Sequence, residues 1–274
     1  MAIRIITDST ASIPREFVKE HNLIIVPLKI TLDEEESYDY WEDEYHVFYD
    51  KLAKSKSFPT TSLPSPEEFD QKFQEVVANG DQAVCLTISS SLSGTYNSAR
   101  IAAEKYGEKI AVVDSGQTCQ ALWLLVEEIE ELIEQGLSAV EIGKQMEQIK
   151  KKTFIHFIPE TMEYLKRGGR ISLLKASMAT FLKIKPTLTF NDGKLENTKK
   201  SIGMGRAVRD LFEGLPQKIK KIFAIHIGDN PFFEKIKQIV SEKFKGILVR
   251  EGNISPIVGA HIGPGAIGIT YILA

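Results

Sequence analysis

The chain has 274 residues, of which 43% are hydrophobic and 26% are charged. This length allows one large or two modest α/β domains with proper cores. The formal net charge of −3 excludes an electrostatic case for nucleic-acid binding. The start predicts a strand rather than a signal peptide, and no apolar run is long enough to span a bilayer. We therefore expect a cytoplasmic protein with no nucleic-acid partner and at most transient membrane contact.

The first half of the chain alternates strand patterns with helix patterns. Strands are predicted at residues 3–6, 23–30, 83–88 and 110–113. Helices are predicted from about Pro14, at 42–54, from Pro66 behind a Ser65 cap, and at 96–103, 120–135 and 138–151. The three prolines within 59–66 predict no regular element there. This alternation predicts a parallel sheet with right-handed crossovers.

The second half has a different pattern. Strands are predicted at 154–158, 183–190, from 195 onward, at 221–227 and at 266–272, with a helix at 231–244. A hairpin is predicted around Asn191-Asp192-Gly193-Lys194. The resulting fold class is α/β, with an N-terminal three-layer domain on a parallel sheet at 1–152. A second, α+β domain with a mixed sheet is predicted at 153–274.

The strongest functional signal is the segment Ser89-Ser90-Ser91-Leu92-Ser93-Gly94-Thr95. It follows a buried strand and precedes a helix, which is where open α/β sheets bind ligands. Free N–H groups and the helix dipole favour an anion at such a place. Helix capping alone explains one serine, but five hydroxyls in seven residues exceed what a cap needs. We therefore predict an uncharged cradle for an anionic head group.

Short polar side chains also follow other strands or lie in loops: Asp8-Ser9, Thr60-Thr61-Ser62 and Asp114-Ser115. Parallel strands end along one edge of a sheet, so these clusters could converge at that edge. A Ser93, His261 and Asp114 triad is an alternative, although Gly-x-Ser-x-Gly is absent. The histidines and two cysteines show no metal-ligand spacing, so neither a metal nor a cofactor is predicted.

Two further loop residues are candidates for binding an anion. His261 stands between glycines in a predicted loop, and Arg170 follows two glycines. A guanidinium there either binds a carboxylate or phosphate bidentately or simply occupies a surface turn. The sequence 263–268 matches a dinucleotide fingerprint, but no helix can follow it, and Walker A is absent. We therefore expect that this chain does not bind ATP alone.

The second half is rich in large apolar side chains near short helices. They form either ordinary core or the wall of an elongated apolar cavity beside the polar cradle, and composition does not separate the two. The residues are Phe154, Phe157, Met162, Leu165, Leu173, Leu174, Met178, Phe181 and Leu182.

Eight motifs in order along nearly the whole chain resemble the DegV family. They are Thr7-Asp8-Ser9-Thr10, Pro27-Leu28, Thr61-Ser62-x-Pro64-Ser65, Ser91-Leu92-Ser93-Gly94-Thr95-Tyr96-x-Ser98-Ala99, Asp114-Ser115, Gly168-Gly169-Arg170-Ile171, Ile184-Lys185-Pro186 with Asp192-Gly193, and His261-x-Gly263-Pro264-Gly265-Ala266. Each motif alone is weak, whereas the ordered set is specific.

The resemblance implies a bacterial lipid-binding protein with two α/β domains and a long-chain fatty acid between or within them. It implies no catalysis by this chain. Instead, the chain presents the acyl carboxylate to a separate ATP-dependent kinase, which forms acyl phosphate for phospholipid synthesis. On this resemblance Thr61 and Ser93 hydrogen-bond the carboxylate, and Arg170 and His261 lie near the head group. Ser62, Gly94 and Thr95 complete the predicted ligand-binding set.

One departure concerns the kinase partner. Family members often carry a basic-rich stretch where this chain has Ser201-Ile202-Gly203-Met204-Gly205-Arg206, a difference that bears on kinase docking. Two alternatives remain beside the kinase-dependent binding protein. One is a stand-alone serine hydrolase or acyltransferase using Ser93, and the other is a fatty-acid sensor without a kinase. The sequence sets neither acyl chain length and saturation nor the oligomeric state.

Overall fold

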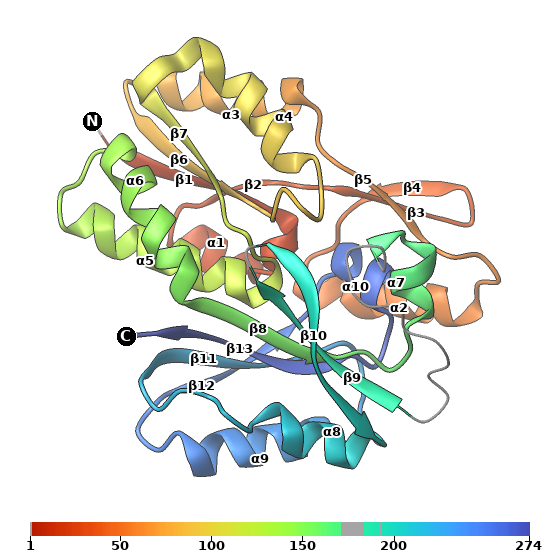
Figure 1. Cartoon of the computed structure of the whole chain (residues 1–274). Coiled ribbons are helices and arrows are strands. Elements are labelled where there is room, and N and C mark those ends of the chain that lie inside the picture. The colour runs from red at the N-terminus through yellow and green to blue at the C-terminus, as the bar shows by residue number, and fades with distance from the viewer. Residues whose placement is uncertain (1, 171–183, 192) are drawn as a thin grey trace.

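The computed structural model describes residues 2–170, 184–191 and 193–274. Their strands form three sheets (Figure 1). One sheet is wholly parallel, in the order β2-β1-β6-β7. Its strands are β1 (Ile3–Asp8), β2 (Ile24–Val26), β6 (Gln82–Thr87) and β7 (Ile110–Asp114).

Helices cover both faces of the parallel sheet (Figure 1). One face carries α3 (Pro66–Ala78) and α4 (Thr95–Ala103), and the other carries α5 (Cys119–Glu134) and α6 (Ala139–Ile149). Neighbouring residues of a strand point to opposite faces, so Ile5 and Ile6 enter different apolar clusters. The predicted three-layer arrangement on a parallel sheet is confirmed.

The second sheet has the order β10-β9-β8-β13-β11-β12 and is mixed, because β11 and β12 are parallel whereas the other neighbours are antiparallel. Its strands are β8 (Thr153–Ile158), β9 (Ile184–Asn191), β10 (Lys194–Ile202), β11 (Ile219–His226), β12 (Val249–Asn253) and β13 (Ile267–Leu273). Its outer face packs on α8 (Met204–Leu211) and α9 (Phe233–Lys243). The predicted mixed sheet is confirmed, while a domain boundary at 152 stays a prediction because α5 packs on both sheets.

A small antiparallel sheet, β4-β3-β5, was not predicted. It contains β3 (Lys29–Leu32), β4 (Glu35–Tyr38) and β5 (Thr60–Ser62). The predicted single strand at 23–30 is wrong, because the chain leaves the parallel sheet after β2 and Pro27 has no N–H for a ladder. The prediction of no element within 59–66 is also wrong, since three residues between Pro59 and Pro64 suffice for β5.

The small sheet packs on α2 (Tyr45–Lys54) and on α10 (Pro256–Ile262) through one apolar cluster. His261 therefore lies in the last turn of α10, and its prediction as a loop residue is wrong. Pro256 suits the first turn of this helix. Gly263, with φ of 82°, ends it in a conformation that favours glycine. Two other short helices are α1 (Arg15–Glu20) and α7 (Glu163–Arg167).

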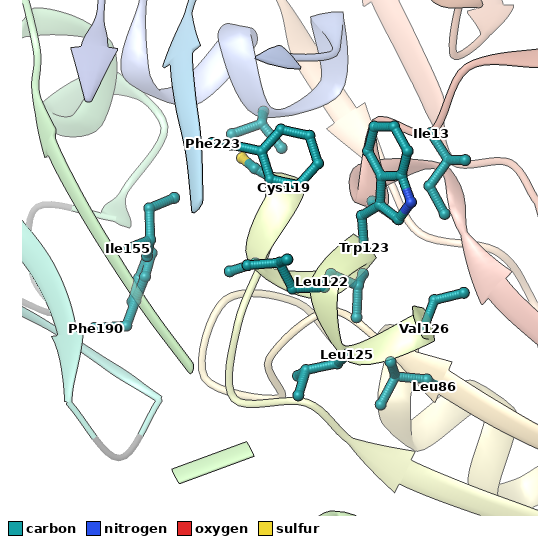
Figure 2. Close-up of a cluster of buried hydrophobic side chains, with 14 of the residues drawn as sticks. Ile13, Leu86, Cys119, Leu122, Trp123, Leu125, Val126, Ile155, Phe190 and Phe223 are labelled. Atoms are coloured by element: carbon teal, nitrogen blue, oxygen red, sulfur yellow. The ribbon is translucent and has the colours of Figure 1, made fainter. Parts of the chain in front are cut away.

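Helix α5 lies between the parallel sheet and the mixed sheet (Figure 1). Twelve of its sixteen residues are buried, so apolar side chains leave it on nearly every side. Figure 2 shows Trp123 directed toward Ile13 and Leu122 directed toward Ile155, on opposite sides of the helix. One apolar cluster thereby joins both sheets.

We expect Leu125→Ala to lower the free energy of unfolding by about 2–5 kcal/mol, because Leu125 is fully buried in α5 and its truncation leaves a cavity. Urea denaturation measures the change. The matched control is Leu248→Ala, since Leu248 is 78% exposed and its loss should cost less than about 0.5 kcal/mol. Equal effects of the two substitutions would contradict the central role of α5.

Candidate functional site

A cavity of about 60 Å³ lies between the strand ends of the parallel sheet and the inner face of the mixed sheet. Its polar lining comes from Thr61, Ser93, Thr118, Arg170 and His261. The rest of its wall is apolar apart from the Cys119 thiol, and consists of Leu28, Ile88, Leu92, Ile155, Phe157, Leu165, Phe190, Leu195, Ile254, Ile257, Val258 and Ile262. Such a lining suits a ligand that is mostly hydrocarbon with one polar end.

Thr61 and His261 meet at this cavity although 200 positions separate them in the sequence. The hydroxyl Oγ1 of Thr61 lies 2.8 Å from Nε2 of His261. The backbone of Thr61 pairs with Ile30 in β3, and α10 packs on the same small sheet through Ile257. The packing of these elements therefore fixes the distance between the two side chains.

Ser93 reaches the cavity from the segment that joins β6 to α4. Its N–H donates to the Ser89 carbonyl at 3.2 Å, and its Oγ lies 2.9 Å from Oγ1 of Thr95. Asp8 holds the start of this segment, because its carboxylate accepts the Ile88 N–H at 2.7 Å. Burial raises the pKa of Asp8 to about 6, against the opposing effect of its hydrogen bonds.

Arg170 brings positive charge to the cavity. Its guanidinium donates to the Leu92 carbonyl at 3.1 Å and to the Gly168 carbonyl at 2.7 Å. Within the described part of the chain it pairs with no carboxylate. Burial lowers its pKa from the ordinary value, yet an arginine stays charged. A half-buried cation whose protein partners are neutral carbonyls favours an anionic group on a ligand.

His261 is neutral at pH 7. Burial lowers its pKa to about 4, and the charge of Arg170 acts in the same direction. Its Nδ1 is buried without a hydrogen-bond partner among the described residues. Gly168 lies against this nitrogen, and a Cβ at that position would stand 2.4 Å from Nδ1. The close approach explains why a side chain at position 168 would displace the imidazole.

The other predicted site residues lie outside the lining of this cavity as far as the structure describes it. Ser62 is exposed, as strand alternation after Thr61 requires. Gly94 is exposed at the start of α4, and Thr95 is buried against Ser93. Contacts of these three residues with a ligand stay a prediction.

The four polar clusters converge only in part. Thr61 and Ser93 line one cavity, whereas Asp114 and Ser115 line another. Asp114 accepts hydrogen bonds from the Ser90 and Gly116 N–H groups, each at 3.0 Å. The triad of the serine-hydrolase alternative is therefore not assembled in this structure, since His261 contacts Thr61 and Asp114 contacts Ser90.

The apolar residues of the second half divide among several places. Phe157 and Leu165 line the cavity, whereas Phe154 lines the second cavity and Met162 belongs to the core. The remaining five predicted wall residues lie outside the described residues: Leu173, Leu174, Met178, Phe181 and Leu182.

Sequence reasoning missed Thr118 and Cys119, which line the cavity at the start of α5. They follow the end of β7, so the strand-end rule that found Ser93 also applied to them. Cys119 has φ of 54°, an uncommon left-handed conformation for a residue with a side chain. Burial raises the pKa of its thiol to about 12, which keeps it protonated and unreactive.

Two further observations concern the described residues as a whole. No helix in this part of the chain is long and apolar enough to cross a membrane. Within the same ranges, no group of three or more His, Cys, Asp or Glu side chains is arranged to hold a metal ion.

Comparison with known proteins places the whole chain in one family. The family model described as "Uncharacterised protein, DegV family" matches residues 2–274. The chain belongs to the DegV family. A DegV domain-containing protein of Clostridium acetobutylicum is 34% identical over 99% of this chain and 98% of its own length. Protein DegV of Bacillus subtilis is 31% identical over 99% of each chain.

Solved DegV family structures share the fold. The chain superposes with a TM-score of 0.90 and 28% identity on a Thermus thermophilus DegV family protein described by its fatty acid binding, with both chains fully covered. It superposes with a TM-score of 0.89 and 29% identity on DegV from Bacillus subtilis, described as a fatty acid binding protein, again over both whole chains. The predicted resemblance to the family is confirmed.

We expect the His261 imidazole to stay neutral until the pH falls to about 4. An unfolded histidine has a pKa near 6.5. Between pH 6.5 and pH 4 the imidazole is therefore protonated in the unfolded chain and neutral in the folded chain. This site therefore loses stability as the pH falls from 6.5 toward 4. Urea denaturation should show that the free energy of unfolding falls less between pH 7 and pH 5 for His261→Gln than for the unaltered protein. The same decrease in both proteins would contradict this assignment.

Proposed function

We propose that this chain binds a long-chain fatty acid in the cavity and presents its carboxylate to a separate ATP-dependent kinase. The observation that supports it most is the joining of an apolar wall to a polar group built from Thr61, Ser93, Arg170 and His261. Relatives described as fatty acid binding proteins share this fold over the whole chain. At about 60 Å³ the cavity holds the carboxylate at the polar group and the start of the acyl chain along the apolar wall, and the rest of a long chain needs the wall to move.

The hydrogen bonds around His261 suit a carboxylate. With its proton on Nε2, the imidazole donates to Thr61 Oγ1 and leaves a lone pair on Nδ1 near Arg170. A buried lone pair without a partner costs less than a buried N–H without one. The Thr61 proton is then free to donate to a carboxylate oxygen, and Ser93 donates to the other. Arg170 supplies the compensating charge.

We expect Thr61→Val and Ser93→Ala each to weaken fatty-acid binding about ten- to a hundredfold, because each removes a hydrogen bond to a charged group worth about 1.5–3 kcal/mol. Delipidated protein is titrated with palmitate and oleate, and the dissociation constants are compared. The matched control is Thr60→Val, since Thr60 is the exposed neighbour of Thr61 on the opposite face of β5.

Fresh protein should also release a fatty acid on solvent extraction, detected by mass spectrometry, because burial of each methylene contributes about 0.8 kcal/mol. Affinities of Thr61→Val and Ser93→Ala equal to that of the unaltered protein would remove the carboxylate from this position. Failure of delipidated protein to take up either acid would end the proposal.

The proposal that this chain presents the carboxylate to a partner kinase rests on the groups that phosphoryl transfer requires. That reaction needs a phosphate cradle, Mg²⁺ and a positioned nucleotide. The sequence contains no Walker A pattern that would supply the cradle. The polar group here holds one end of the lipid in place, which is a positioning role. We infer that the nucleotide and metal come with the kinase, which forms acyl phosphate for phospholipid synthesis.

We expect acyl phosphate to form from fatty acid, ATP and Mg²⁺ when a kinase of the partner class is present, and not with this chain alone. Trapping with hydroxylamine followed by mass spectrometry measures the product. Acyl phosphate formed by this chain alone would contradict the proposed division of labour. Ester hydrolysis that disappears in Ser93→Ala would instead establish the hydrolase alternative. Lipid binding with no acyl phosphate formed in the presence of a kinase would favour the sensor.

A further inference from the structure

Phe190 borders two cavities. It lines the cavity of about 60 Å³ proposed for the lipid, and it also lines a second cavity, of about 290 Å³, which Ser90 and Ser91 line as well. It is the one residue that the described linings of these two cavities share. We propose that the Phe190 ring is the part of the lipid cavity wall that moves, turning into the second cavity when a long acyl chain binds. The inference rests on the proposed lipid binding, and it assigns to Phe190 the selection of acyl chain length.

The lipid cavity has too little room for a long acyl chain. Its volume of about 60 Å³ is well below the roughly 300–1,000 Å³ of sites for drug-sized ligands. Much of the wall cannot yield, because side chains such as Ile155, Phe157 and Leu165 are buried in the apolar cluster that joins both sheets. Protein interiors are close-packed, so a buried side chain moves only where space adjoins it. The second cavity provides such space next to Phe190.

The backbone at Phe190 is held in place, whereas its ring can turn. Phe190 pairs with Leu195 in the β9–β10 ladder, and the Gly193 carbonyl accepts a hydrogen bond from Ser89 Oγ at 3.3 Å. The hairpin is thus held against the segment that carries Ser93. A strand residue commonly adopts either of two χ1 rotamers, so the ring can turn without a change in the backbone. A phenyl ring has no polar atom, so the turn itself breaks no hydrogen bond.

Each cavity offers the ring an apolar neighbour. On the lipid side Phe190 stacks on Phe157, with ring centroids 6.3 Å apart and an angle of 29° between the ring planes. On the other side, Phe154 lies in the lining of the second cavity. The methylenes of an acyl chain replace the ring against Phe157, and burial of each methylene is favourable. A short acid gains little from this exchange, whereas a long acid gains more with every methylene, so the turn of Phe190 favours long chains.

The test fills the second cavity with a bulky side chain. Lys151 lines this cavity and is exposed, so Lys151→Trp adds an indole there without disturbing the core. Delipidated full-length protein is titrated with palmitate and with octanoate, whose chain is half as long. We expect Lys151→Trp to weaken palmitate binding about tenfold and to leave octanoate binding nearly unchanged. Lys152→Trp is the matched control and should retain both affinities, because Lys152 is also exposed but lies outside the lining of the second cavity.

Phe190→Ala removes the ring that has to turn. The loss of palmitate affinity caused by Lys151→Trp should therefore disappear in the Phe190→Ala background, which a double-mutant cycle detects. The loss should persist in the Phe157→Ala background, since Phe157 lines the lipid cavity but not the second cavity. Phe190→Leu repeats the cycle with a smaller loss of apolar volume if Phe190→Ala does not fold. A crystal structure with palmitate should show the Phe190 ring in the second cavity.

Several results would overturn the inference. These are equal palmitate affinities of Lys151→Trp and Lys152→Trp, a loss from Lys151→Trp that persists without the Phe190 ring, or a palmitate complex in which that ring stays stacked on Phe157. Equal losses of palmitate and octanoate affinity in Lys151→Trp would also contradict it, because chain length would then not matter. In each of these cases the unaltered protein still binds palmitate, whereas failure of the lipid proposal means that it takes up neither acid.

Discussion

The structure depends on one helix that is buried on both sides. Helix α5 packs on the parallel sheet and on the mixed sheet, so a single apolar cluster connects the two. Burial at about 25 cal/mol per Å² of apolar surface makes this shared helix a major source of cohesion. It also holds the strand ends of one sheet opposite the inner face of the other. The first residues of α5 line the space between them.

The candidate site follows from that placement. Thr61 comes from a three-residue strand, Ser93 from a strand-to-helix segment and His261 from the last turn of α10. Each of these elements contributes one polar side chain, so the polar group of the site forms only where the elements pack together. Helix α7 is followed by Arg170, whose hydrogen bonds to the Leu92 carbonyl tie it to the segment of Ser93. Together they place hydroxyls, an imidazole and a positive charge at one end of an apolar cavity.

Strand–helix alternation sufficed to predict the parallel sheet, because each apolar run had a helix pattern between it and the next. The small sheet was not predictable in this way. Strand β5 has three residues between prolines and takes its stability from pairing with β3, a contact that local sequence does not contain. The Thr61–His261 contact was unpredictable for the same reason, since 200 residues separate the partners. The family motifs identified Thr61 and His261 as site residues, but they did not predict the contact between the two side chains.

The same separation sets an order of events during synthesis. The ribosome makes β5 early, and α10 follows almost all strands of both large sheets. A growing chain thus carries the Thr61 hydroxyl long before its imidazole partner exists. A ligand that needs both groups has no complete site to enter while the parallel sheet is forming. The position of one histidine in the chain therefore means that the polar lining of the cavity is complete only after nearly all of the chain has been made.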